Sequence, residues 1–304
     1  MAPLFDGFAL ERVDVGDAVL RVRRGGSGPP VLLLHGHPQT HAMWHRVAPR
    51  LAERFTVVAP DLRGYGESSA PAARPDHAQA SKRAMALDNV RLMERFGFRR
   101  FAVAGHDRGG RVAYRMALDH PDVVTHLAVL DIVPTIDAWE RADRKWLLDY
   151  WHWVFLAQPE PIPERLLAAD PDAYYLPNRS LFAADALADY LTAVHRLDVI
   201  HSMCEDYRAG AGIDVEIDAA DRAAGRLIAC PILAMWSRTD LGRWHDVLAV
   251  WRQWADEPGA VTGRELDVGH YLAEEAPDEV ADALREFFAA GLSPTQGRRA
   301  PSAL

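Results

Sequence analysis

The sequence of 304 residues contains only two cysteines, Cys204 and Cys230, which are too few for a disulfide framework or a thiolate metal site. Long hydrophobic runs are missing as well: the longest, such as residues 31–34, are far shorter than the ~18 apolar residues of a membrane-spanning helix. The first ten residues lack the basic stretch and apolar core of a signal peptide. We therefore expect a reduced cytoplasmic protein, with no membrane partner and with neither metal nor cofactor.

The sequence also has fewer basic than acidic residues. The 34 Lys and Arg residues are outnumbered by 43 Asp and Glu, which gives a formal net charge of −9. Such a balance argues against nucleic acid as a partner. An anionic substrate would gain no long-range attraction either, because salt screens charges beyond roughly 8 Å. A site for an anion would therefore need its own local cations.

The apolar segments alternate between strand-like and helix-like patterns. Helical spacing is found at residues 82–95, 111–119 and 277–289, and buried or alternating strand patterns at 18–24, 31–34, 55–59, 101–104, 127–133 and 231–236. Alternating strands and helices predict an α/β fold, a mostly parallel sheet with helices on both faces.

The alternation stops between residues 134 and 226. This segment has no convincing buried strand and carries four of the nine tryptophans. We expect residues 1–133 and 227–290 to form one α/β core, and residues 134–226 a helical lid inserted into it. Residues 291–304, rich in Gly, Pro, Ser and Arg, are expected to be a disordered tail.

The most specific motif is GHDRG at residues 105–109, directly between a strand and a helix. It matches the glycine-flanked nucleophile elbow of α/β-hydrolases, with Asp107 in place of serine. A simpler interpretation is an ordinary strand-to-helix turn with an Asp cap. A carboxylate nucleophile needs no base to attack an sp3 carbon, so an Asp elbow points to alkyl halides or epoxides rather than esters.

Residues that would complete such a site follow in the expected order. His270 lies after the last strand-like segment, where it could activate water. The segment that begins at His35 follows a strand and would place a backbone N–H, with His37 in the pocket wall, against an oxyanion. Asp131 and Asp240 both lie at strand ends, and either could orient His270.

Two arginines stand next to the predicted nucleophile. Arg108 is adjacent to Asp107, and Arg111 lies one helical turn further on the same face. Their guanidinium groups could clamp a substrate carboxylate and would supply the local cations that an anion needs. Alternatively, they could pair with nearby acids or point to solvent.

Over nearly its whole length the sequence resembles the fluoroacetate (haloacetate) dehalogenases of the α/β-hydrolase superfamily. Besides residues 35–40 and 269–270, the resemblance rests on GHDRGGR at 105–111, LDIVPT at 130–135, YWHW at 150–153 and MCEDYRAG at 203–210.

The resemblance implies hydrolytic dehalogenation of small anionic 2-haloacids with water, through an ester on Asp107. It favours Asp131 over Asp240 as the acid of the triad, implies a homodimer, and assigns halide binding to His152, Trp153 and Tyr207. Their imidazole, indole and phenol groups are hydrogen-bond donors, as a small, hard leaving group requires. The sequence departs from the family pattern at position 37, where His replaces Phe, and in residues 174–185, which contain no Trp. These departures leave the preferred halogen open, including whether C–F bonds are cleaved.

Two other functions remain open. An epoxide hydrolase would share the Asp-His-Asp set and would use lid tyrosines as acids, but it usually carries Trp after the nucleophile, where this sequence has Arg108. A non-catalytic receptor of the same fold would not require the complete set of Asp107, His270, a strand-end acid and an oxyanion loop.

Overall fold

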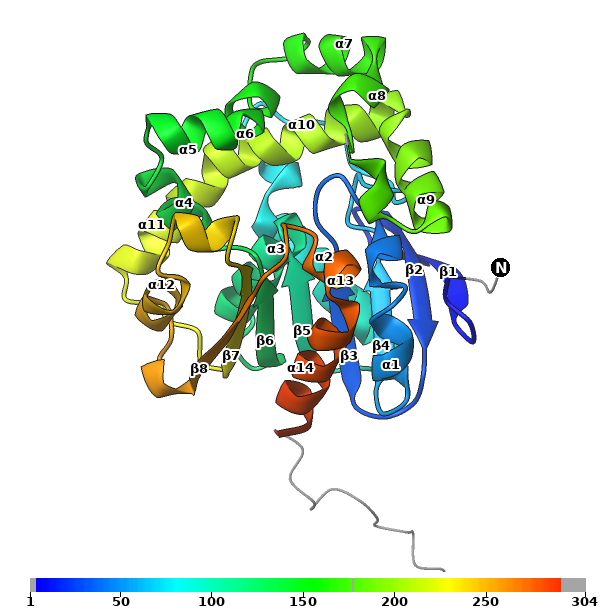
Figure 1. Ribbon diagram of the computed structural model, residues 1–304, viewed down its shortest axis with the longest axis vertical. Helices are drawn as coiled ribbons and strands as arrows, with labels where there is room; N and C mark the ends of the chain where they lie inside the picture. The colour runs from blue at the N-terminus through cyan, green and yellow to red at the C-terminus, as the bar shows by residue number, and fades with distance from the viewer. Residues whose placement is uncertain (1–3, 177, 291–304) are drawn as a thin grey trace, which may run out of the picture.

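The computed structural model describes residues 4–176 and 178–290, which build one eight-stranded sheet flanked by helices (Figure 1). The strand order is β1-β2-β4-β3-β5-β6-β7-β8. β2 pairs antiparallel with β1 and β4, and all other neighbours pair parallel. The predicted α/β fold with a mostly parallel sheet is therefore confirmed. The strands are β1 (Ala9–Asp14), β2 (Val19–Gly25), β3 (Pro30–Leu34), β4 (Thr56–Pro60), β5 (Phe101–His106), β6 (Val124–Leu130), β7 (Ile232–Ser237) and β8 (Val261–Leu266).

The central strands are buried because helices cover both faces of the sheet. Every residue of β5 is buried, and in β3 and β4 only the first residue is partly exposed. α1 (Ala48–Ala52) packs with α14 (Pro277–Ala290), and α2 (Lys82–Arg95) packs with α3 (Arg108–Asp119) across the sheet from them (Figure 1). α12 (Val247–Gln253) joins α3 through Tyr114 and Trp251, whose ring centroids lie 5.8 Å apart.

A helical insertion, residues 135–223, lies between β6 and β7 and crosses the carboxyl end of the sheet at the top of Figure 1. The described part of the chain forms no strand there, in agreement with the sequence pattern. The helices are α4 (Thr135–Glu140), α5 (Arg144–Asp149), α6 (Trp151–Leu156), α7 (Ile162–Ala169), α8 (Pro171–Tyr174), α9 (Ala184–Val194), α10 (Leu197–Ala211) and α11 (Ile213–Ala223).

Polar contacts fix the insertion to the sheet. On α9, Asp189 accepts hydrogen bonds from Arg21 at 2.8 Å and from Thr40 at 2.6 Å. On α10, Asp206 accepts one from Tyr65 at 2.6 Å and pairs with Lys82. These contacts join segments that are far apart in the sequence, and they hold the insertion over the carboxyl end of the sheet.

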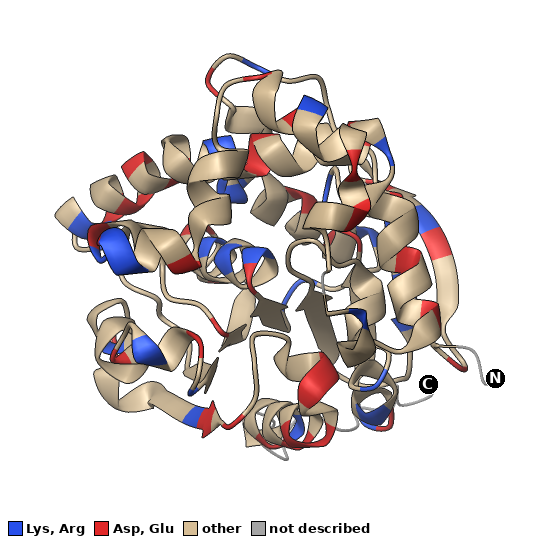
Figure 2. Ribbon diagram, turned by 45° about the horizontal axis from the view of Figure 1, so that its top comes forward, with Lys and Arg blue, Asp and Glu red and all other residues tan. Residues whose placement is uncertain are grey.

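The remaining helix, α13 (Leu272–Glu275), leads from β8 into α14. Acidic and basic residues are interspersed over the outer helices, and neither sign gathers on one face in Figure 2. No helix within residues 4–176 and 178–290 is long and apolar enough to cross a membrane. The predicted disordered tail, residues 291–304, lies outside the described residues.

Candidate active site

Asp107 occupies the sharp turn between β5 and α3. Its φ of 45° and ψ of −118° lie in a backbone region that non-glycine residues rarely adopt. A Cβ on Gly105 would lie 2.3 Å from the carbonyl oxygen of Gly109, and one on Gly109 would lie 2.3 Å from that of His35. Backbone segments therefore approach too closely for a side chain on either flank, which is the physical reason for the glycines of the elbow pattern.

The loop after β3 holds one oxygen of this carboxylate. The backbone N–H of His37 donates to Oδ2 of Asp107 at 2.9 Å. A Cβ on Gly36 would lie only 2.6 Å from the Cβ of Asp107, so this approach too requires a glycine. Oδ1 of Asp107 makes no hydrogen bond with a described residue, and Asp107 lines a cavity of about 790 Å³. One oxygen is thus held and the other is free.

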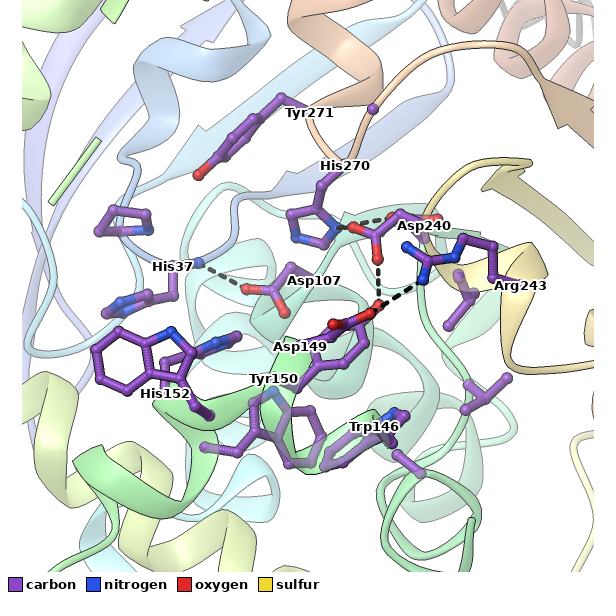
Figure 3. A pocket seen from close by; sticks show the side chains of 18 of the residues that line it. His37, Asp107, Trp146, Asp149, Tyr150, His152, Asp240, Arg243, His270 and Tyr271 are labelled. Carbon is purple, nitrogen blue, oxygen red and sulfur yellow. Dashed lines mark hydrogen bonds and ion pairs between the residues drawn. The ribbon is translucent and has the colours of Figure 1, made fainter. Parts of the chain in front are cut away.

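His270 follows β8 and points toward the strand-end acids (Figure 3). Its Nδ1 donates to Oδ2 of Asp131 at 2.7 Å, whereas Oδ2 of Asp240 lies 3.5 Å away. Asp131 is fixed in turn, because its Oδ1 accepts a hydrogen bond from the backbone of Ser237 at 2.8 Å. Asp240 accepts instead from the hydroxyl of Tyr150. Asp131 is therefore the direct partner of His270, and Asp240 is a second nearby charge.

These charges set the protonation of the site. Burial opposes a charged imidazole, but the hydrogen bond and charge of Asp131, followed by the charges of Asp240 and Asp107, outweigh it and raise the pKa of His270 to about 10. Burial would also raise the pKa of Asp107, but the positive charge of His270, with the arginines of α3, holds that pKa well below its usual range. Asp107 is therefore an ionised carboxylate at neutral pH.

Arg108 is buried and already has a carboxylate partner. Its Nε and Nη2 donate to the two carboxylate oxygens of Asp206 at 2.9 and 2.8 Å. Gly210 allows this packing, since a Cβ there would lie 2.7 Å from Nη2. Only Nη1 of Arg108 has no hydrogen-bond partner among the described residues. The charge of Arg108 is therefore largely matched within the protein, and only the buried NH2 group at Nη1 is left without a partner among the described residues.

Arg111 is different because no carboxylate pairs with it in residues 4–176 and 178–290. Its Nη1 donates to the carbonyl of Val133 at 3.0 Å and to the hydroxyl of Thr135 at 3.2 Å. The guanidinium lies over the ring of Trp153, 4.6 Å from the centroid, and faces the cavity that Asp107 lines. Burial lowers the pKa of Arg111 from its ordinary value. An anion beside it would supply the missing counter-charge.

Three side chains of the insertion line the same cavity: His152, Trp153 and Tyr207. The rings of His152 and Tyr207 lie 5.9 Å apart, and those of Trp153 and Tyr207 lie 6.4 Å apart. Burial lowers the pKa of His152 to about 4 and raises that of Tyr207 far above 10, so both are neutral. None of the three donates a hydrogen bond from its side chain to a described residue, which leaves three donors for a ligand.

Several neighbours were given no site role by the sequence patterns. Asp206, which pairs with Arg108, lies within the motif at 203–210, but nothing in the motif identified its partner. Residues 174–176, which belong to the stretch without Trp, line the cavity. Tyr271 also lines it and adds a phenol next to His270. Nε2 of His106 donates to the carbonyl of His270 at 2.7 Å, which helps to hold the loop that carries His270.

Asp131, Asp240 and His270 also form the one group of metal-type ligands within the described ranges, with ligand atoms less than 4.8 Å apart. All three side chains already make hydrogen bonds: His270 with Asp131, and Asp240 with the hydroxyl of Tyr150. The hydrogen bond between His270 and Asp131 describes an acid–histidine pair.

A nucleophile turn after β5, an acid after β6 and a histidine after β8, at the carboxyl edge of a parallel sheet, define an α/β-hydrolase. The family model for the alpha/beta hydrolase fold matches residues 29–277, and the chain belongs to this family of hydrolases.

Within the family, the chain is 45% identical to a fluoroacetate dehalogenase from Burkholderia sp. over 97% of this chain and 99% of that protein, and it belongs to the haloacetate dehalogenase family. It is also 35% identical to a soluble epoxide hydrolase from Corynebacterium sp. (strain C12), over 87% of this chain and 91% of that protein. A solved alpha/beta-hydrolase structure from Nostoc sp. PCC 7120 superposes with a TM-score of 0.89 at 47% identity, covering 92% of this chain and 97% of that one.

Proposed function

We propose that this hydrolase removes halide from small 2-haloacids such as haloacetates. The observation that carries the proposal is Arg111, a buried guanidinium without a carboxylate partner among the described residues, in the same cavity as the free oxygen of Asp107. A substrate carboxylate on Arg111, and on Nη1 of Arg108, would place the adjacent carbon next to Asp107. The resemblance to a fluoroacetate dehalogenase supports the same substrate class.

In the first step, Oδ1 of Asp107 attacks the carbon that bears the halogen. The new C–O bond forms as the carbon–halogen bond breaks, and the halide leaves with the bonding electrons. Negative charge grows on the halogen, where the N–H groups of His152 and Trp153 and the hydroxyl of Tyr207 would donate to it. The arginines neutralise the substrate carboxylate, which would otherwise repel the nucleophile.

In the second step, neutral His270 takes a proton from water, which attacks the ester carbonyl carbon on Asp107. The developing oxyanion is Oδ2, which already accepts the backbone N–H of His37 at 2.9 Å. Collapse of this intermediate breaks the bond between the Asp107 carbonyl carbon and the substrate oxygen, which takes the proton from the imidazolium of His270 and leaves as a 2-hydroxy acid. Asp107 loses its remaining hydroxyl proton to solvent and is again a carboxylate. Asp131 stabilises the imidazolium that forms.

The helical insertion would serve as a lid, since it carries the three proposed halide donors and lines the same cavity as Asp107. The proposal includes a cytoplasmic location, which rests on the two unpaired cysteines of the sequence, and a homodimer, which rests on the sequence resemblance.

Epoxide hydrolysis is the second candidate. It is favoured by the 35% identity to a soluble epoxide hydrolase and by Tyr207 and Tyr150, phenols near Asp107 that could protonate an epoxide oxygen. However, Tyr150 already donates to Asp240, and a neutral epoxide would leave Arg111 without a counter-charge.

A halide-release panel tests the proposal. Purified enzyme is incubated at neutral to alkaline pH with fluoro-, chloro- and bromoacetate, and with styrene oxide. Halide release from at least one haloacetate, with no diol from styrene oxide, is the expected result. Diol formation without halide release from any 2-haloacid would overturn the proposal in favour of epoxide hydrolysis.

A further inference from the structure

The cavity is larger than a haloacetate requires. Its volume is about 790 Å³, within the range of roughly 300–1,000 Å³ that holds drug-sized ligands. A haloacetate has only five heavy atoms. Once its carboxylate lies on Arg111 and its halogen on the donors of the insertion, space remains beside the reacting carbon for a substituent.

One wall of this space is polar, and its groups have no task in the two-step mechanism. We define the polar wall as the side chains of His37, Tyr175 and Tyr271, which all line the cavity. In Figure 3, the His37 ring and the Tyr271 hydroxyl both lie on the side of Asp107 away from Asp149 and Arg243. The wall lies next to the nucleophile, because the backbone N–H of His37 donates to Asp107 and Tyr271 directly follows His270.

The polar atoms of the wall make no hydrogen bonds with the described part of the chain. Nδ1 of His37 and the hydroxyl of Tyr175 are buried without a partner, and the two rings lie 5.7 Å apart. The Nε2 of His37 and the hydroxyl of Tyr271 also have no partner within residues 4–176 and 178–290, and neither is among the fully enclosed atoms. These two atoms are open to the cavity.

The charge of the wall indicates which substituent fits. Burial lowers the pKa of His37 to about 3, so the ring is a neutral imidazole with one donor and one acceptor. Burial also raises the pKa of Tyr271, which stays a neutral phenol. A second carboxylate would find no counter-charge here and would face Asp107. An alkyl group would displace water from these polar atoms without replacing its hydrogen bonds.

We propose that the polar wall selects 2-haloacids that carry a neutral hydroxyl-bearing substituent, such as hydroxymethyl, on the carbon that Asp107 attacks. A hydroxyl group both donates and accepts, as the imidazole and phenol do. This inference rests on the proposed dehalogenation and names the substrate class of that same site.

The test compares two substrates of the same shape and configuration: 2-chloro-3-hydroxypropanoate, with a hydroxymethyl group, and 2-chlorobutanoate, with an ethyl group. The readout is the ratio of their kcat/KM values for chloride release, at neutral pH and corrected for release without enzyme. One hydrogen bond corresponds to about a tenfold preference. We therefore expect the natural enzyme to favour the hydroxymethyl substrate by about tenfold or more.

Two variants probe the wall. His37→Phe removes the ring nitrogens and keeps the backbone N–H, and Tyr271→Phe removes only the hydroxyl. Each should move the ratio toward one. Tyr190→Phe is the matched control, because it also removes one phenol hydroxyl, but that hydroxyl donates to Glu274 and Tyr190 does not line the cavity, so the ratio should stay unchanged.

A natural-enzyme ratio of one or less, or a ratio that neither wall variant changes, would overturn the inference. Chloroacetate is measured in parallel and separates the two proposals. Without chloride release from chloroacetate or either larger acid, and without halide release from fluoroacetate or bromoacetate, the dehalogenase proposal fails and the polar-wall inference fails with it. With release from chloroacetate but no hydroxymethyl preference, only the polar wall is refuted.

Discussion

His270 and Asp131 form a direct hydrogen bond of 2.7 Å between Nδ1 and Oδ2, although Asp240 lies only 3.5 Å from the same nitrogen. The difference follows from the anchoring of the two acids. Asp131 is buried and also accepts the backbone N–H of Ser237, whereas Asp240 accepts from Tyr150. A fixed acid can orient the imidazole, and a second acid adds mainly charge.

Asp131→Asn should therefore reduce kcat by roughly 10²–10⁴-fold, because an amide neither stabilises the imidazolium nor selects the correct tautomer. Asp240→Asn is the matched control and should change kcat by less than about tenfold in either direction. Steady-state halide release from a haloacetate measures both. Equal losses in the two variants would show that His270 depends on both acids alike.

His270→Asn should separate the two chemical steps. Asp107 stays ionised and can still attack, but no base remains to activate water. We expect one equivalent of halide per active site and then no turnover, with the protein heavier by the mass of one carboxymethyl group, the part of chloroacetate that remains on Asp107. Intact-protein mass spectrometry after incubation with chloroacetate measures this. Unmodified protein after a full equivalent of halide would contradict the ester mechanism.

The sequence predicted the main elements of the fold because their local patterns are strong. Helical spacing at residues 82–95 coincides with α2, Lys82–Arg95, and the apolar segment 101–104 lies within β5. β1, Ala9–Asp14, was not predicted, because none of its residues is fully buried and it has no apolar pattern. It forms through pairing with β2, a tertiary cause that no local pattern contains.

The sequence predicted those parts of the site whose residues lie together in one short motif. The turn at Asp107 has its own signature, so its place at the sheet edge could be predicted. The different environments of Arg108 and Arg111 could not, because the partner of Arg108 is Asp206, 98 positions away on another helix. The spacing along α3 predicted the same role, binding of a substrate carboxylate, for both arginines. Long-range packing gives a carboxylate partner to Arg108 and none among the described residues to Arg111.

Arg111→Met should weaken substrate binding with little loss of stability. The guanidinium has no carboxylate partner within the described ranges, so its removal leaves no buried acid unpaired. We expect KM for chloroacetate to rise by at least about 30-fold, the equivalent of a charge-assisted hydrogen bond of ~2 kcal/mol. Initial rates and thermal unfolding measure the two effects.

Arg108→Met is the comparison for this variant. It removes a bidentate partner of buried Asp206, which keeps only Lys82 as a cation partner, so the free energy of unfolding should fall by ~3 kcal/mol. A larger loss of stability in Arg111→Met than in Arg108→Met would contradict the distinction between the two arginines.

Gly36→Ala should reduce activity strongly, because the new Cβ would lie 2.6 Å from the Cβ of Asp107. Relief of this clash requires the loop that carries the His37 N–H, or the nucleophile itself, to move. We expect at least a 100-fold loss in kcat and a lower free energy of unfolding. Gly259→Ala is the control, since no atom lies within 4 Å of a Cβ there. Activity like that of the natural enzyme in Gly36→Ala would show that the approach is not required.

The two steps should respond differently to pH. The pKa of Asp107 is held well below its usual range, so formation of the ester should not change with pH between about 6 and 9. Hydrolysis of the ester needs neutral His270, whose pKa is raised to about 10 in the free enzyme. Esterification removes the charge of Asp107, one of the three carboxylates that raise this pKa, so His270 loses its proton more readily in the intermediate.

Because the base form is present above the pKa and lost below it, kcat should rise with pH while the halide burst stays constant. Rapid-quench measurement of the burst and of the following steady-state rate, at several pH values, separates the two steps. Asp240→Asn removes another of these carboxylates and should shift the steady-state profile to lower pH. A burst that decreases in parallel with kcat as the pH is lowered would place the titrating group in the first step instead.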